Sequence, residues 1–111
     1  MSLTPEQRIA RDRTRLLGFP RPDRRAVVVG GGPLAARRAA ALTRSTTPVA
    51  VFAPVLCDEA FDLVAERLVT WENRWPTRGD LQDAWLVHAA TGDAELDARV
   101  CGWATVLRSP A

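Results

Sequence analysis

The residues best suited to chemistry are three consecutive glycines that follow an apolar run. The run is Ala26–Val29, and the glycines are Gly30, Gly31 and Gly32. With Ala35, they make the spacing G-x-G-x-x-A, the looser form of the pattern that binds the pyrophosphate of a dinucleotide. In that pattern the first glycine permits a tight turn, the second lets phosphates approach the backbone, and the small third residue keeps the helix close to the strand. The spacing predicts a nucleotide-binding loop, with a glycine-rich turn without a ligand as the alternative.

Few other side chains suit catalysis or metal binding. Cys57 and Cys101 are the only cysteines, His88 is the only histidine, and the chain has no CxxC spacing or His/Cys cluster. These counts predict two reduced thiols, a buried histidine and no metal site. Asp93 comes just after an apolar run, where a carboxylate is well placed to cap a following helix.

The elements that would position these residues alternate between strands and helices. Apolar runs predict strands over 26–29, 49–53, 68–72 and 84–90, and spacing of three to four residues predicts helices over 33–44, 57–67 and 93–108. Strands that alternate with helices pair in parallel through right-handed crossovers. The predicted fold class is therefore α/β, a Rossmann-like, doubly wound and mostly parallel sheet of about four strands.

In a doubly wound sheet, ligands bind beyond the carboxyl ends of the strands. The segments expected at this edge are 30–32, 53–54, the loop after Glu72, and 91–93. A nucleotide, and any residue that acts on its substrate, is expected in these loops.

The first 25 residues are predicted to form a basic helix and linker, followed by a nucleotide-binding domain over 26–111. Thr4 as a cap, Pro5 in the first turn and Gly18 as a stop predict an extra N-terminal helix over 5–17. The helix carries few apolar residues, so we expect it to lie on the surface or to pack on a partner.

Charge is divided unevenly between the two parts of the chain. Residues 1–44 hold ten arginines and three acids, whereas residues 45–111 hold five arginines and ten acids. A basic half can be a solvated helix face, surround a polyanionic small molecule or attract nucleic acid. Since no helix-turn-helix or base-reading pattern is present, a nucleic-acid partner is not expected.

The chain shows no signal for a membrane or for secretion. No apolar run approaches the roughly 20 residues of a membrane span, and the N-terminus lacks the apolar segment of a signal peptide. We therefore expect a cytoplasmic location and no membrane partner.

Three separated blocks carry a resemblance to a known family. They are VVVGGGPLAARR at 27–38, VAVFAPVLCDE at 49–59 and RGDLQDAWLVHAATGDAELDARV at 78–100. In this order and spacing they resemble the N-terminal domain of siroheme synthase, the family of NAD-dependent precorrin-2 dehydrogenases and sirohydrochlorin ferrochelatases. The match covers about residues 26–100.

The resemblance implies a cofactor site and a function. NAD is the expected cofactor, with NADP left open because Phe52 and Ala53 stand where an acidic residue usually ends the second strand. The implied NAD-binding residues are Gly30, Gly31, Gly32, Pro33 and Leu34 in the loop, Ala53 and Pro54 near the adenosine ribose, and Ala90 and Thr91 on the nicotinamide side. The implied substrate is precorrin-2, which is oxidised to sirohydrochlorin, and the implied assembly is a homo-oligomer.

Two departures bear on catalysis. Gly92 replaces an aspartate of the family pattern, and the family's acid–base aspartate is expected beyond Ala111. Asp93 is the only carboxylate near the predicted nicotinamide loop, so it is the single candidate for a substitute base. We expect the chain to bind NAD and to oxidise precorrin-2 slowly or not at all by itself. The alternative function is a non-catalytic nucleotide-binding or interaction module derived from the family.

Overall fold

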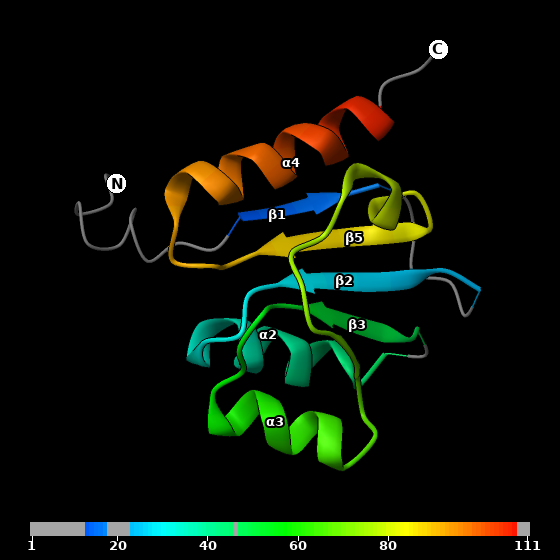
Figure 1. Cartoon of the computed structure of the whole chain (residues 1–111). Helices are drawn as coiled ribbons and strands as arrows, with labels where there is room; N and C mark the ends of the chain where they lie inside the picture. The colour runs from blue at the N-terminus through cyan, green and yellow to red at the C-terminus, as the bar shows by residue number, and fades with distance from the viewer. Residues whose placement is uncertain (1–12, 18–22, 46, 109–111) are drawn as a thin grey trace, which may run out of the picture.

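The computed structural model describes residues 13–17, 23–45 and 47–108. They form a five-stranded sheet with helices on both faces (Figure 1). The elements in chain order are β1 (Arg13–Leu16), β2 (Arg25–Val29), α2 (Pro33–Leu42), β3 (Val49–Phe52), α3 (Asp58–Ala65), β4 (Thr70–Glu72), the short 3₁₀ helix η1 (Arg78–Leu81), β5 (Ala84–Ala89) and α4 (Ala94–Arg108). No described helix has the length and apolar character needed to cross a membrane.

The strand order in the sheet is β1-β5-β2-β3-β4. The four strands β2 to β5 are parallel, and β1 pairs with β5 in the antiparallel direction. The Rossmann-like, mostly parallel sheet predicted from the sequence is thus confirmed, with one strand more than expected. Helices α2 and α3 cover one face of the sheet, and α4 covers the other (Figure 1).

The core is divided between these two faces because side chains alternate along each strand. On β2, Val27 and Val29 pack with Val100 of α4, whereas Ala26 and Val28 pack beneath α2. The last four of its five residues, Ala26 to Val29, are fully buried, as expected of a central parallel strand with helices on both sides.

The prediction of an N-terminal helix over 5–17 is wrong for residues 13–17, the part of this segment that the structure describes. Residues Arg13–Leu16 form strand β1, in which Thr14 pairs with His88 and Leu16 with Leu86. The backbone of β5 would otherwise be left at the edge of the sheet without a neighbour on this side, and hydrogen bonding to it outweighs a weak local preference for helix. Residues 5–12 of the predicted helix lie outside the described part of the chain.

Candidate functional site

Three loops meet at the carboxyl edge of the parallel strands, where the sequence predicted a site. Backbone hydrogen bonds join them: the Gly30 N–H donates to Phe52 at 2.9 Å, the Ala90 N–H donates to Val29 at 2.8 Å, and the Cys57 N–H donates to Gly31 at 2.7 Å. The fold therefore brings together the loops after β2, β3 and β5, which together with the first two residues of α2 contain all the residues assigned to the cofactor.

Gly30 and Gly31 are packed against the protein itself. Gly30 has a φ of +134°, and a Cβ there would collide with the carbonyl oxygen of Ala90. A Cβ on Gly31 would collide with the carbonyl oxygen of Val55. Both positions need glycine because neighbouring backbone already fills the space that a side chain would take. These two glycines therefore allow the loops to pack closely and do not face a ligand.

Gly32 is different, because a Cβ at this position would meet no atom within 4 Å. Gly32 is also the N-cap of α2, no side chain caps this helix, and Pro33 occupies its first turn. The first N–H groups of a helix have no partner inside the helix, and together with the helix dipole they favour an anion. The open side of the loop thus lies where backbone N–H groups can receive phosphate oxygens.

The loop after β3 offers apolar groups. The Ala53 side chain is fully buried, its N–H donates to Glu72 at 3.1 Å, and its carbonyl accepts the indole N–H of Trp71 at 2.8 Å. The two following residues, Pro54 and Val55, are exposed, and 76% of Val55 is accessible. Of the two residues predicted here, Pro54 presents its side chain to solvent and Ala53 does not.

The loop after β5 is fixed by a carboxylate that the sequence analysis missed. Asp97 is only 9% exposed, and its Oδ1 accepts the Thr91 hydroxyl at 2.7 Å and the Thr91 N–H at 3.0 Å. Thr91 in turn accepts the Asp93 N–H at 3.0 Å. A signal was present in the sequence, since Asp97 lies between Leu96 and Val100 at the start of α4, where a buried carboxylate requires a partner.

Asp93 caps α4, as the sequence predicted. Its Oδ1 accepts the backbone N–H groups of Glu95 at 3.0 Å and of Leu96 at 3.2 Å. These bonds satisfy two N–H groups of the first turn, which have no partner inside the helix. The side chain is exposed at the same edge as Thr91, so it combines a capping role with a position near the candidate site.

His88 lies in the core, as the sequence predicted. It is 1% exposed, and its Nδ1 lies 2.8 Å from the Thr14 hydroxyl of β1. Across the described residues, no group of three His, Cys, Asp or Glu side chains could hold a metal ion.

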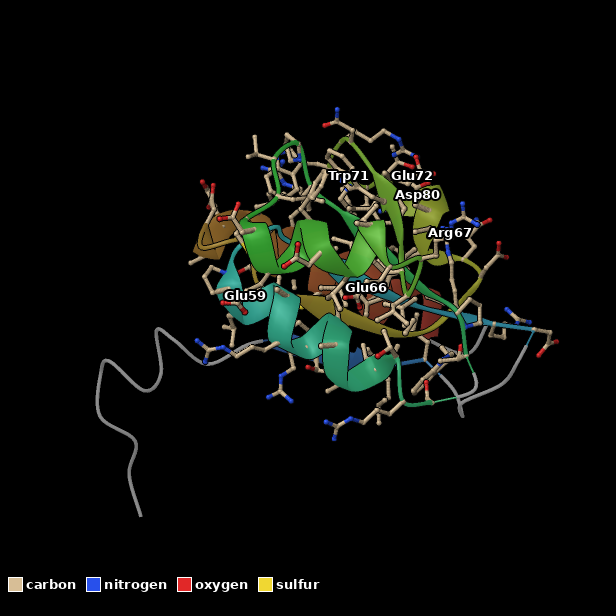
Figure 2. The ribbon with its side chains drawn as sticks, turned by 90° about the horizontal axis from the view of Figure 1, so that it is seen from below. Glu59, Glu66, Arg67, Trp71, Glu72 and Asp80 are labelled. Atoms are coloured by element: carbon tan, nitrogen blue, oxygen red, sulfur yellow. The ribbon has the colours of Figure 1, made fainter. Side chains whose placement is uncertain are left out.

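An ion pair holds the segment between β4 and η1. The Arg74 guanidinium binds both oxygens of Asp80, at 2.8 and 3.0 Å, and Asp80 also accepts the N–H and hydroxyl of Thr77. Asp80 is labelled in Figure 2, which views the sheet from the side of α2 and α3. Hydrogen bonds from Arg74, and then from Thr77, hold the pKa of the Asp80 carboxyl well below its usual range. The bonds fix the chain as it leaves the carboxyl edge and returns toward β5.

Comparisons with known proteins give a consistent result. Residues 21–111 match the model of a family described as "Putative NAD(P)-binding". The chain is 39% identical over 94 residues to the siroheme synthase of Nitrosospira multiformis, covering 79% of this chain and 20% of that protein. It is 37% identical over 78 residues to the siroheme synthase of Thioalkalivibrio sulfidiphilus, covering 70% of this chain and 16% of that one.

A solved structure, titled "SirC, precorrin-2 dehydrogenase", superposes with a TM-score of 0.65 and 26% identity, covering 70% of this chain and 39% of that one. The chain spans a fifth or less of the length of these two siroheme synthases.

Proposed function

The chain belongs to the family described as "Putative NAD(P)-binding", and from this premise we propose that it binds NAD and forms the cofactor-binding part of a precorrin-2 dehydrogenase. The resemblance to siroheme synthase seen in the sequence motifs is confirmed by relatives at 37% to 39% identity and by the precorrin-2 dehydrogenase neighbour.

The single observation that carries the proposal is the open side of the glycine loop. Backbone atoms occupy the space beside Gly30 and Gly31, whereas the space beside Gly32, at the start of α2, is open. No side chain caps this end of the helix. A pyrophosphate fits this position because backbone N–H groups can approach its oxygens without a side chain between them.

The proposed cofactor-binding residues fall on the three loops that meet at this edge. They are Gly30, Gly31, Gly32, Pro33 and Leu34 after β2, Ala53 and Pro54 after β3, and Ala90 and Thr91 after β5. Gly32 and the start of α2 would hold the pyrophosphate, and Thr91 would line the nicotinamide side. Gly30, Gly31 and Ala53 are packed against other residues of the protein. They would contribute to the site by setting the path of the backbone.

Bound NAD would supply a hydride acceptor for the oxidation of precorrin-2. The chain's own part is to bind and orient the cofactor, with Asp97 holding Thr91 in place. Asp93 is the candidate proton acceptor, and its Oδ1 already accepts two backbone N–H groups at the start of α4. We further propose that the working unit is a homo-oligomer located in the cytoplasm.

The second candidate function is a nucleotide-binding module without catalysis. The hydrogen bonds that Asp93 accepts from Glu95 and Leu96 favour this second function, because the carboxylate oxygen Oδ1 is already occupied in the cap of α4. The two functions share the cofactor site and differ in turnover. They are separated by NADH formation at 340 nm with precorrin-2: turnover near about 1 per second supports the enzyme, and cofactor binding without turnover supports the module.

Calorimetric titration with NAD and NADP tests the shared site directly. We expect both to bind with similar Kd values, because residues 53–56 contain no carboxylate to bond a ribose 2′-hydroxyl or to repel a 2′-phosphate. Absence of heat with either cofactor at about 1 mM, a concentration that detects weak binding, would contradict the proposed function. A preference of more than about tenfold for one of them would contradict only the prediction of equal binding.

A further inference from the structure

Trp71 connects the edge strand β4 to the loop that follows β3. It is paired in register with Val51, whose side chain lies on the face of the sheet covered by α2 and α3. Residues in register on parallel strands place their side chains on the same face, so the half-buried indole of Trp71 lies on that face as well. Its N–H donates to the Ala53 carbonyl at 2.8 Å. Trp71 therefore acts at the proposed cofactor edge without belonging to any of the three loops that form it.

Both backbone polar groups of Ala53 are bound to β4. The Ala53 N–H donates to the Glu72 carbonyl at 3.1 Å, and the Ala53 carbonyl accepts the Trp71 indole N–H. Figure 2 labels Trp71 and Glu72, the two residues of β4 that make these bonds. Because Ala53 is fully buried, neither group can turn to solvent instead, and the two bonds set the direction in which the chain leaves β3.

The other end of the same loop is bound to the glycine loop. The Cys57 N–H donates to the Gly31 carbonyl at 2.7 Å, while Pro54 and Val55 between the two fixed ends are exposed. Three hydrogen bonds thus join this loop to β4 and to the glycine loop, and only the one from Trp71 is made by a side chain. It is the one bond of the three that a substitution can remove without changing the backbone.

The position of this loop bears on the adenosine half of a dinucleotide. The proposed site places the adenosine ribose beside Ala53 and Pro54, and residues 53–56 contain no carboxylate to bind the ribose hydroxyls. The loop therefore offers adenosine the shape and the apolar surface of Pro54 and Val55. Contacts of this kind depend on a loop that is already in place, because ordering it during binding would cost affinity.

We infer that Trp71 is a positioning residue for the adenosine half of the dinucleotide. Its indole N–H holds the Ala53 carbonyl, which keeps Pro54 and Val55 where the adenosine contacts them. The inference rests on the proposed function and deepens it, since it assigns a residue of β4 to the cofactor site. NAD and NADP share the adenosine, so the affinity for both depends on Trp71.

Trp85 provides a matched control. Its indole N–H also donates at 2.8 Å, to the hydroxyl of Thr47, which precedes β3 at the amino edge of the sheet, opposite the cofactor edge. Trp71→Phe and Trp85→Phe each remove one indole hydrogen bond and retain an aromatic ring. Circular dichroism checks the fold of both variants. Calorimetry measures the Kd for NAD and for ADP-ribose, which lacks the nicotinamide.

In Trp71→Phe we expect the Kd for NAD to rise at least about fivefold, a loss of the size of one hydrogen bond, and the Kd for ADP-ribose to rise by the same factor. In Trp85→Phe both Kd values should stay within about twofold of the parent. A smaller rise in a folded Trp71→Phe chain, an equal rise in Trp85→Phe, or a rise for NAD alone would overturn the inference and leave the cofactor site in place. Absence of NAD binding by the parent would overturn the proposed function and the inference with it.

The indole N–H resonances of the parent give a second measurement that needs no variant. In a nitrogen–proton correlation spectrum, the Trp71 resonance should shift when ADP-ribose is added, because its acceptor is the loop that contacts the adenosine. The Trp85 resonance should not move, since its acceptor Thr47 lies at the opposite edge. An unmoved Trp71 resonance at saturating ADP-ribose would overturn the inference, whether or not Trp71→Phe folds.

Discussion

The two loops that face each other at the carboxyl edge are held in opposite ways. The loop after β2 is fixed by the lack of side chains, because backbone from Ala90 and Val55 occupies the space beside Gly30 and Gly31. The loop after β5 is fixed by side chains, because Asp97 binds the hydroxyl and the N–H of Thr91. Gly30 and Gly31 are therefore needed because they have no side chain, whereas Asp97 and Thr91 are needed for the hydrogen bonds that their side chains make.

The comparison also separates the three glycines by role. Gly30 and Gly31 allow the loops to approach each other, and Gly32 keeps the outer side of the edge open. Substitutions in the two loops should accordingly change either folding or ligand binding, and each kind of change can be measured.

The largest effect is expected for Gly30→Ala. The added Cβ collides with the Ala90 carbonyl, and the φ of +134° is unfavourable for alanine. The free energy of unfolding should fall by at least about 3 kcal/mol, the sum of backbone strain and overpacking. Urea unfolding measures it, with Gly32→Ala as the matched control that should change stability by less than about 1 kcal/mol. Equal stability of the two variants would show that the loops do not pack closely.

Asp97→Leu should have the next largest effect. It leaves the Thr91 hydroxyl and N–H without their acceptor in a partly buried place, which costs about 2–3 kcal/mol. Asp97→Asn retains an acceptor oxygen and should lose less than about 1 kcal/mol. Hydrogen exchange of the Thr91 amide reports the local change, and unaltered protection in Asp97→Leu would mean that the loop is held by other contacts.

Gly32→Val should change binding and spare the fold. The valine side chain has room in the protein but occupies the space through which a pyrophosphate would approach. We expect the Kd for NAD to rise at least tenfold, about 1.4 kcal/mol, with an unfolding free energy within about 1 kcal/mol of the parent. Undiminished NAD binding in a folded Gly32→Val chain would contradict the position assigned to the phosphates.

Two substitutions at Asp93 separate its role as a helix cap from a role in proton transfer. Asp93→Ala removes the cap of α4 and should lower stability by about 1 kcal/mol, whereas Asp93→Asn keeps a good cap and should have little effect. If the chain turns over precorrin-2, loss of NADH formation in Asp93→Asn at unchanged stability would assign the base to this residue. Full activity in Asp93→Asn would exclude it.

The smallest effect on stability is expected for Asp80→Asn, which removes the ion pair between Arg74 and Asp80. This pair lies in a third loop, between β4 and η1, that is more exposed than the other two. Because the pKa of Asp80 is lowered in the folded state, its contribution is present above the unfolded value of about 3.9 and is lost as pH falls through the lower folded value. Asp80→Asn should therefore remove part of the decrease in stability on acidification. Urea unfolding at a series of pH values below about 5 measures it, and an unchanged slope would show that the pair contributes nothing.

Much of the fold followed from patterns within short segments. The apolar run before Gly30 and the proline after Gly32 indicated β2, the turn and α2, and the alternation of strands and helices indicated a parallel sheet. The position of Asp93 after an apolar run was enough to predict the cap of α4. These features depend on neighbours within a few residues, so the sequence displays them directly.

Strand β1 could not be predicted from its own residues. Arginines with a single leucine pair suit a helix surface as well as a strand, and the choice was made by hydrogen bonds to β5. The contact between Thr14 and His88 spans 74 residues of the chain. A local pattern carries no information about a partner at that distance.

The sequence by itself determined the order of the elements, the glycine loop at the start of α2 and the family to which the chain belongs. Only the tertiary structure decided which glycines face protein and which faces open space, and that Asp97 holds Thr91. The reason is physical: periodicity and turn chemistry act between neighbours in the chain, whereas close packing, buried hydrogen bonds and surface charge patterns arise when distant segments meet.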